Sequence, residues 1–339
     1  MTLTERIEGF SGLGKALRSE NWGILIENAY RQNGWFTPDS CAFAIANWGT
    51  LLTNNHLADW AAHYPLNEIS TKKIGVVSAG NIPLAGFHDF LCTLLANHTV
   101  LIKLSAKDDI LLKGISQRLI EIAPGFKDRI QFVSGILPAC DAIIATGSDN
   151  AAKHFEYYFK NTPHIVRRNR NSVAVLDGNE KEEEIIGLAR DIFTYFGLGC
   201  RNVSKVFIPT GYDLDLIFRG LFEWKEIAKN NKYISNYEYN KTLYLLNKES
   251  LLENGFIVLK ESSELSSPVG VLFYEYYSNL NDLKEKLVNI KEKIQCVVNS
   301  KGEFFSNVKF GEAQCPKLFD YADGFDTLQF LTNLPTLDK

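Results

Sequence analysis

The first 65 residues carry apolar side chains at helical spacing. Over residues 20–32 they recur every three or four positions, and Asn33-Gly34 follows as a pair that commonly ends helices. Thr2-x-x-Glu5 has the spacing of a capping box, and Thr37-Pro38 is typical of a helix start. We therefore expect this region to be helical. The glycine-rich stretch 9–15 follows no strand, so it indicates part of the first helix and not a phosphate loop.

From residue 72 the pattern changes to short apolar runs that alternate with amphipathic segments. We expect strands at 73–79, 99–104, 130–134, 142–145 and 164–167, and helices at 84–96, 108–122 and 150–159. This alternation predicts a parallel sheet covered by helices on both faces. Such a sheet binds its ligands at the carboxyl ends of its strands.

A second α/β pattern follows the charged run at 180–184, which favours a solvent-exposed helix start. We expect helices at 182–196, 214–230 and 280–294, and strands at 203–208, 241–246, 255–259, 269–274 and 296–299. Asp177-Gly178 is the expected domain boundary. The predicted division is 1–178, 179–299 and a segment 300–339 that returns to the interface or completes the core.

The composition and charge of the chain mainly exclude classes of function. The 339 residues are 45% hydrophobic and 22% charged, which is typical of a globular protein, and a net charge of −4 does not favour nucleic acid as a partner. No apolar run reaches the roughly 18 residues of a membrane span, and the N-terminus does not have the pattern of a signal peptide. The six scattered cysteines predict a reduced, cytoplasmic protein, and neither cysteines nor histidines show metal-site spacing.

The strongest candidate for chemistry is Cys200. A helical, aromatic-rich run breaks at Gly197 and Gly199, the cysteine follows, and an apolar strand begins at Val203. Glycines without a Cβ let the backbone approach a substrate closely. A helix-to-strand corner can present a thiolate and its own N–H to the same small volume, as nucleophile and oxyanion donor. The alternative is an ordinary core cysteine.

Polar residues follow three of the predicted strands. Asn81 precedes Pro83, Lys103 and Ser105 end the second strand, and Thr146-Gly147-Ser148 precedes a helix. A helix N-terminus can bind phosphate. In isolation, a turn asparagine and an exposed strand-end lysine are the favoured interpretations of Asn81 and Lys103.

Taken in order with Glu264-Leu-Ser-Ser-Pro268-Val269, these segments resemble the aldehyde dehydrogenase superfamily. The closest branch is that of the LuxC-type acyl-CoA reductases, the fatty-acid reductase component of bacterial bioluminescence. Phe310-Gly-Glu-Ala-Gln and the segment 320–328 are similar to the C-terminal signature of that branch. The resemblance covers about residues 70–335. It implies a Rossmann-like dinucleotide-binding domain followed by a second α/β catalytic domain, in a shortened form.

The resemblance also implies roles for single residues. Cys200 would attack an acyl-CoA or an acyl-protein thioester, of fatty type, while Asn81 and the Cys200 N–H hold the oxyanion. The acyl-enzyme would then be reduced to the aldehyde with NAD(P)H. The residues at the family's cofactor-binding positions are Lys103, Ser105, Thr146, Gly147, Ser148 and Glu264. For Glu264, a solvated loop carboxylate is the alternative.

Two departures from the family pattern shape the prediction. Hydrolytic aldehyde dehydrogenases carry a water-activating glutamate at the start of the segment that here reads Arg-Arg-Asn-Arg-Asn-Ser over 167–172. No carboxylate lies there, which favours reduction over oxidation to the acid. The arginines either meet cofactor or CoA phosphates or form a solvated cluster. Ala106 stands where NAD-preferring relatives place a ribose-binding glutamate, which favours NADPH, with NADH as the alternative.

Two other functions stay open at this point. One is an aldehyde or semialdehyde dehydrogenase that acts oxidatively. The other is a non-catalytic assembly protein of the same fold. The chain is shorter than is usual for this fold, which favours keeping that alternative. The expected partners are the thioester substrate and either further copies of the chain or a reductase complex.

Overall fold

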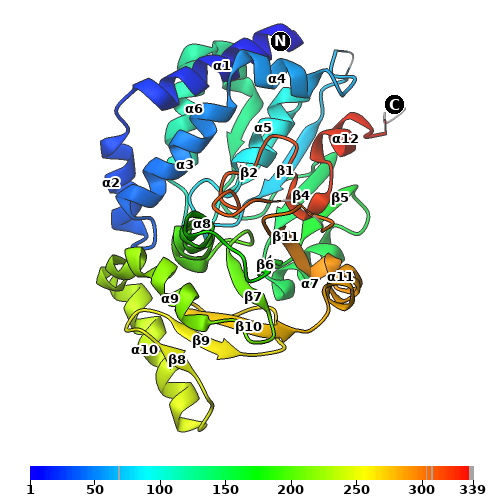
Figure 1. The fold of residues 1–339 in the computed structure, drawn as a ribbon. Coiled ribbons are helices and arrows are strands. Elements are labelled where there is room, and N and C mark those ends of the chain that lie inside the picture. Colours follow the sequence, from blue (N-terminus) through cyan, green and yellow to red (C-terminus); the bar gives the residue numbers. More distant parts are fainter. Residues whose placement is uncertain (68, 303, 307, 336–339) are drawn as a thin grey trace. The chain divides into compact units, whose positions relative to one another are not determined.

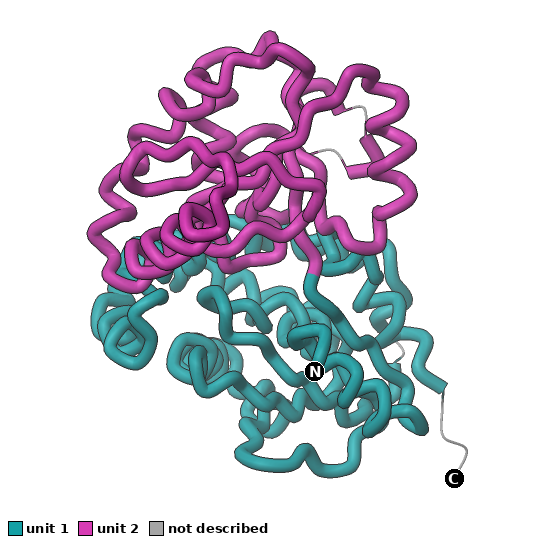
Figure 2. Tube along the Cα trace, turned by 90° about the horizontal axis from the view of Figure 1, so that it is seen from below, with its two compact units in different colours: residues 1–169, 317–339 teal, residues 170–316 magenta. Residues whose placement is uncertain are grey.

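The computed structural model describes residues 1–335 except 68, 303 and 307. The chain forms two compact units, residues 1–169 with 317–339 and residues 170–316 (Figure 2). Each unit is described separately below. The domain division 1–178, 179–299 and 300–339 stays a prediction, because compactness alone does not define a domain. Among the described residues, no helix is long and apolar enough to cross a membrane.

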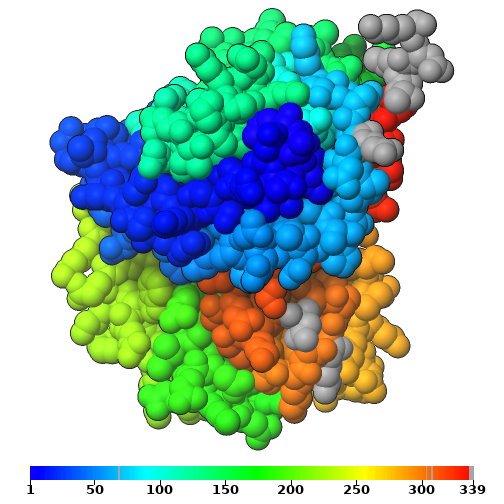
Figure 3. All heavy atoms as spheres, turned by 90° about the horizontal axis from the view of Figure 1, so that it is seen from above, coloured from blue at the N-terminus to red at the C-terminus, as the bar shows by residue number. Residues whose placement is uncertain are grey.

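The N-terminal region is helical, as predicted. Its helices are α1 (Leu3–Ser19), α2 (Gly23–Gln32), α3 (Pro38–Leu51) and α4 (Asn54–Ala61) (Figure 1). Both expected helix starts are confirmed, because Thr2 forms a capping box with Glu5 and Thr37 caps α3. The glycine-rich stretch lies inside α1. Residues of α1 (blue) lie beside those of α6 (Leu111–Ile122, turquoise) on one face of the first unit (Figure 3).

The first unit contains a five-stranded, wholly parallel sheet in the order β3-β2-β1-β4-β5. The strands are β1 (Lys73–Val77), β2 (Thr99–Lys103), β3 (Ile130–Phe132), β4 (Ala142–Thr146) and β5 (His164–Arg167). The helices between them, besides α6, are α5 (Phe87–Leu95) and α7 (Asp149–Tyr158). This confirms the predicted Rossmann-like arrangement, because the order reverses at the central strand β1.

The last part of the chain, from residue 317, packs into the first unit, whereas residues 300–316 belong to the second. Its helix α12 (Thr327–Thr332) contacts α5. The indole N–H of Trp60 donates a 2.9 Å hydrogen bond to the hydroxyl of Tyr321, and Arg167 donates at 2.8 Å to the hydroxyl of the fully buried Thr327. The first unit therefore needs both ends of the described chain for its interior.

The second unit contains a six-stranded sheet in the order β11-β6-β7-β10-β9-β8, parallel except for β8. The strands are β6 (Asn171–Val175), β7 (Val203–Pro209), β8 (Leu252–Glu253), β9 (Val258–Glu261), β10 (Val271–Tyr277) and β11 (Ile294–Val298). The helices are α8 (Glu182–Phe193), α9 (Leu214–Leu221), α10 (Asn231–Leu246) and α11 (Leu280–Asn289). One core cluster joins α11 to the central strands through Val173, Phe207 and Leu287.

One predicted strand is wrong, and two strands of the second unit were not predicted. The expected strand at 241–246 is the last part of α10, which begins at the cap Asn230 and buries Tyr233 and Tyr237. That helical spacing outweighs the apolar run that suggested a strand. Strand β6 begins with Asn171 and Ser172 and directly follows a run of arginine and asparagine, so its apolar stretch is too short to indicate a strand. Strand β8 is only two residues long, too short for any pattern.

Candidate functional site

The carboxyl edge of the first sheet gathers the candidate residues of the first unit. Strand β1 lies between β2 and β4, with Val77 in register with Lys103 on one side and Ala145 on the other. The N–H of Ser78 donates to the carbonyl of Lys103 at 3.0 Å, so the end of β2 is also hydrogen-bonded to the residue that follows β1. The turn with Asn81, the pair Lys103 and Ser105, and the segment 146–148 therefore share one edge.

The turn that carries Asn81 packs against the loop after β2. A Cβ on Gly80 would lie 2.5 Å from the Cβ of Ser105, so only glycine permits this contact. Leu84 closes the turn with a left-handed backbone, φ 59°, and its N–H donates at 2.9 Å to Asp108. Asn81 itself is exposed. The position of this asparagine thus depends on the neighbouring loop.

Asp108 is an unexpected buried carboxyl at this edge. It is 5% exposed, and its second oxygen accepts no hydrogen bond among the described residues. Burial raises the pKa of Asp108 to about 7, although the Leu84 N–H favours the charged form. Burial, with the nearby Asp108 charge, also raises the pKa of Cys41 to about 12, which makes that thiol unreactive at neutral pH.

The segment 146–148 forms the start of α7. Ser148 caps the helix by accepting the N–H of Ala151 at 3.3 Å. A Cβ on Gly147 would lie 2.9 Å from the Cβ of Ala151 and 3.0 Å from the Phe155 ring, so the strand can approach the helix closely only with glycine. A helix N-terminus behind a glycine turn fits the phosphates of a dinucleotide.

The three arginines of 167–170 do not act as one cluster. Arg167 is buried and forms an ion pair with Asp89, so it is part of the interior of the first unit. Arg168 is exposed and pairs with Glu156 at 2.5 Å. Arg170 belongs to the second unit, where it lies 3.6 Å from Glu292. A phosphate-binding role for Arg167 therefore has no support.

In the second unit Cys200 follows an unusual turn. Tyr195, Phe196 and Gly197 all have left-handed backbones, with φ of 56°, 59° and 76°. Such a conformation costs about 1–2 kcal/mol for each residue other than glycine. The turn stops α8 at Phe193 and not at 196 as predicted, and it directs the chain toward Cys200, just before β7.

Two side chains hold the backbone on either side of Cys200. Asn202 is 3% exposed and accepts the N–H of Gly199 at 2.8 Å. On the other side, the hydroxyl of the buried Ser172 donates at 2.9 Å to the carbonyl of Cys200 and lies 2.9 Å from the sulfur of Cys296. Cys200 itself is half-buried. Its main chain is therefore fixed from both directions.

Glu264 lies in the same unit, in the loop between β9 and β10. The hydroxyl of Ser204 donates at 2.7 Å to the carbonyl of Leu265, which ties this loop to the start of β7. The Glu264 side chain is exposed. The loops that carry Cys200 and Glu264 are thus anchored to neighbouring positions on one edge of the second sheet.

The first part of the predicted C-terminal signature, residues 310–314, packs against α8. Both carboxylate oxygens of Asp191 accept backbone N–H groups, from Gly311 at 2.7 Å and Ala313 at 2.9 Å. The carbonyl of Ala313 accepts from the guanidinium of Arg201, next to Cys200, at 2.5 Å. Burial nevertheless raises the pKa of Asp191 to about 7.

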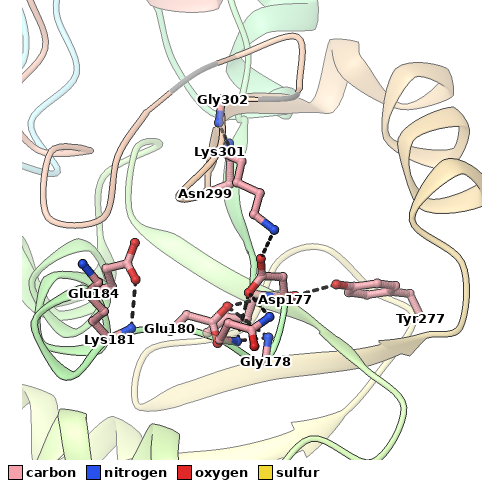
Figure 4. Close-up of polar contacts among 11 residues, drawn as sticks. Asp177, Gly178, Glu180, Lys181, Glu184, Tyr277, Asn299, Lys301 and Gly302 are labelled. Atoms are coloured by element: carbon pink, nitrogen blue, oxygen red, sulfur yellow. Dashed lines mark hydrogen bonds and ion pairs between the residues drawn. The ribbon is translucent and has the colours of Figure 1, made fainter.

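The opposite, carboxyl edge of the second sheet is occupied by its own side chains (Figure 4). Lys301 pairs with Asp177 at 2.5 Å, and the hydroxyl of Tyr277 donates at 2.7 Å to the carbonyl of Leu176. Glu180 accepts the N–H groups of Asp177 and Gly178. These contacts join the ends of neighbouring strands, which is a structural role. The described residues also contain no group of three or more metal-ligating side chains.

Sequence reasoning missed four residues of this site, namely Ser172, Asp191, Asn202 and Asp108. Their buried contacts are mostly with backbone groups distant in sequence, which leaves no local pattern. The candidate residues that it named divide between the units. Asn81, Lys103, Ser105, Thr146, Gly147 and Ser148 lie in the first unit, and Cys200 and Glu264 lie in the second. Their joint role therefore stays a prediction.

The fold is that of the aldehyde dehydrogenases. Aldehyde dehydrogenase 21 from Physcomitrella patens, in complex with succinate, matches with a TM-score of 0.68 at 12% identity over 98% of this chain and 84% of its own. An NADP-dependent enzyme from E. coli matches with a TM-score of 0.65 at 11% identity over 88% and 73%. The NAD-dependent aldehyde dehydrogenase from Sinorhizobium meliloti gives 0.61 at 12% over 88% and 70%.

A family model matches part of the chain. The model of the LuxC family, described as acyl-CoA reductase, matches residues 69–216, which span the first sheet, Cys200 and β7. The resemblance to the LuxC-type branch of the aldehyde dehydrogenase superfamily is thereby confirmed. No curated protein sequence matches the chain at a significant level.

Proposed function

We propose that this protein is an NAD(P)H-dependent reductase that converts an acyl-CoA, or an acyl-protein thioester, to the aldehyde through an acyl-Cys200 intermediate. The observation that carries the proposal is the placement of Cys200. It lies in the turn just before β7, inside the region that matches the LuxC family, and the backbone on either side of it is held by Asn202 and Ser172. The residues that fix a nucleophile are thus present around this cysteine.

The Cys200 thiolate attacks the thioester carbonyl, and the thiolate of CoA leaves as the acyl group transfers to the enzyme. Asn81 and the N–H of Cys200 are the proposed donors to the oxyanion, and loss of one such donor typically lowers the rate about 10²–10³-fold. A bound NAD(P)H supplies the hydride that releases the aldehyde and frees the thiolate again. Lys103, Ser105, the segment 146–148 and Glu264 are the proposed cofactor contacts.

The direction of the reaction follows from what surrounds the acyl-enzyme. The segment 167–172 carries no carboxylate at the position where hydrolytic relatives activate water. An acyl-cysteine without a nearby general base hydrolyses slowly, so it persists until it is reduced. This supports reduction over the oxidative release of an acid.

Cofactor preference is proposed to be NADPH. Ala106 is exposed in the loop after β2 and is followed by Lys107, so no carboxylate at this position repels a 2′-phosphate. NADH remains the alternative. The isolated cysteines are in keeping with a cytoplasmic enzyme. Assembly with further copies or with a reductase complex is also part of the proposal.

The test is a reductase assay with a covalent readout. Purified protein is incubated with acyl-CoAs of several chain lengths, first without cofactor and then with NADPH or NADH. We expect a thioester adduct on the Cys200 peptide by mass spectrometry, which disappears as aldehyde forms. Cys200→Ala should form neither, while Cys315→Ala, at an exposed cysteine, should behave as wild type. Equal cofactor consumption by Cys200→Ala would refute the proposal.

The same assay distinguishes the two alternative functions. An oxidative dehydrogenase would reduce NADP⁺ or NAD⁺ with an aldehyde and release free acid at a higher rate than it consumes acyl-CoA. A non-catalytic assembly protein would show no adduct, and its Cys200 would alkylate as slowly as the buried cysteines.

A further inference from the structure

We infer that Asn202 is a positioning residue for the reaction, because it holds the strained turn before Cys200 in the shape that presents the nucleophile. The inference rests on the proposed role of Cys200. It concerns a buried side chain whose hydrogen bonds are made to backbone groups before the nucleophile. These backbone groups lie in residues 191–199.

The contacts of Asn202 reach three successive parts of the chain. Its side-chain amide donates to the carbonyls of Asp191 at 3.1 Å and Ile192 at 3.2 Å, at the end of α8, and to Thr194 at 2.6 Å, at the start of the turn. Its side-chain oxygen accepts from the N–H of Gly199 at 2.8 Å. One amide therefore joins the last turn of a helix to the residue before the nucleophile.

Asn202 also binds Gly199 through its main chain, because its N–H donates to the Gly199 carbonyl at 3.0 Å. Both backbone groups of Gly199 are thus held by one residue. The peptide between Gly199 and Cys200 contains the N–H that is proposed to bind the oxyanion. Any shift of Gly199 would move that donor directly.

The turn needs such support because it is unfavourable by itself. Tyr195 and Phe196 are non-glycine residues with left-handed backbones, a conformation that is unfavourable for any residue with a Cβ. Strain of this kind persists only where surrounding contacts fix it, and it concentrates at functional sites. The three carbonyls held by Asn202 lie immediately before these two residues. Without the amide, we expect the turn to relax and Cys200 to move.

The second sheet provides a matched control. Asn299 is also 3% exposed, and its side chain likewise spans backbone groups, accepting the N–H of Gly302 at 2.6 Å. It lies at the carboxyl edge of the sheet, after β11 (Figure 4), whereas Cys200 precedes β7. Asn299→Ala therefore removes a buried amide of the same unit without touching the Cys200 turn.

The experiment measures the rate at which iodoacetamide alkylates Cys200 in the full-length protein, with Cys315 as an internal reference. Asn202→Ala is expected to slow Cys200 alkylation by clearly more than about twofold, because the displaced thiol loses the environment that sets its reactivity. It should lower kcat for acyl-CoA reduction with little change in KM. Asn299→Ala should leave both rates within about twofold of wild type, although both variants lose thermal stability.

A second variant tests the chemistry of the amide. Asn202→Asp keeps an acceptor for Gly199, but its carboxylate faces three carbonyl oxygens. When protonated it regains one donor. The ratio of the Asn202→Asp rate to the wild-type rate should therefore rise as the pH falls from 8 to 5.5. A residue with only a general packing role would give a ratio that does not change with pH.

The outcomes separate the inference from the proposed function. If Cys200 of the wild type alkylates no faster than the buried cysteines, the proposed nucleophile fails, and the role of Asn202 fails with it. If wild-type Cys200 is reactive and Asn202→Ala retains its rate, the function stands and the inference is wrong. If Asn299→Ala slows Cys200 equally, the effect is one of general stability, which also overturns the inference.

Discussion

The N–H of Gly311 donates a 2.7 Å hydrogen bond to the carboxylate of Asp191, so the segment after the second sheet is fixed to the end of α8. The contact depends on Gly187 on the same helix. A Cβ at Gly187 would lie 2.8 Å from the carbonyl carbon of Phe310 and 3.0 Å from the nitrogen of Gly311. The helix and the segment can therefore meet only where the side chain is absent.

Replacing Gly187 by alanine should displace this segment. We expect a loss of about 1–3 kcal/mol in the free energy of unfolding of the second unit, because backbone atoms have to move to admit the new methyl group. Urea unfolding of the full-length protein, followed by circular dichroism, measures this loss. Cys200 alkylation should also slow, because Arg201 is anchored to Ala313.

Gly211→Ala is the control for that variant. Gly211 has φ of 86°, and no atom would lie within 4 Å of an added Cβ, so the change costs only backbone strain. Cys200 alkylation should stay normal in this variant. Equal effects of Gly187→Ala and Gly211→Ala on alkylation would contradict the proposed contact.

Asp108→Asn should change how stability depends on pH. The folded pKa of Asp108 is about 7, well above the usual value, so between pH 4 and 7 the native state holds a proton that the unfolded chain has lost. Raising the pH in this range therefore lowers the free energy of unfolding by up to about 1.4 kcal/mol per pH unit. His98 acts in the opposite sense, because burial lowers its pKa to about 4 and stability is lost as pH falls below about 6.5.

The measurement is the difference in unfolding free energy between Asp108→Asn and wild type from pH 4 to 8. It should rise with pH up to about 7 and then stay constant, since only the Asp108 contribution differs. Parallel curves for the two proteins would show that Asp108 does not titrate in this range.

Ala106→Glu should shift the cofactor preference toward NADH. A carboxylate at this position repels a 2′-phosphate and can hold the ribose hydroxyls. Ala106 is exposed, and its carbonyl accepts from Gln32 at 2.9 Å through the backbone, so the substitution should fold normally. We expect the ratio of kcat/KM for NADPH to that for NADH to fall at least about tenfold. Ala106→Gln, without the charge, is the control, and an unchanged ratio in Ala106→Glu would remove this residue from the cofactor site.

Asp89→Ala should strongly destabilise the first unit. It leaves the buried guanidinium of Arg167 without its carboxylate, a change that typically costs about 3–5 kcal/mol. Glu156→Ala breaks the exposed pair with Arg168 and should cost less than about 1 kcal/mol. Circular dichroism during urea unfolding compares the two variants. Similar losses in both would mean that Arg167 finds another partner.

Much of the first unit could be predicted from the sequence, for physical reasons. Strands β2 and β4 are buried on both faces and form unbroken apolar runs, and helix starts carry caps such as Thr37 and Ser148. These signals are local. Local signals are weaker in the second unit. Leu243, Leu245 and Leu246 of α10 form an apolar run, yet their side chains are exposed, so the run did not indicate a buried strand.

The candidate site was predictable only where chemistry requires a particular residue type in a particular segment. Cys200 and the glycines beside it fall in that class. Asn202 and Asp191 do not, because their roles arise from backbone groups that folding brings to them. The left-handed turn at Tyr195 and Phe196 also runs against local preference, and no propensity argument predicts it.

The first unit is assembled from two stretches of chain with all of residues 170–316 between them. Tyr321 and Leu318 supply contacts to Trp60 and His88 inside that unit. On the ribosome, the sheet residues emerge long before these partners are translated. The nascent first unit therefore keeps aromatic surface uncovered throughout that interval, and we expect its maturation to depend on chaperones that shield such surface.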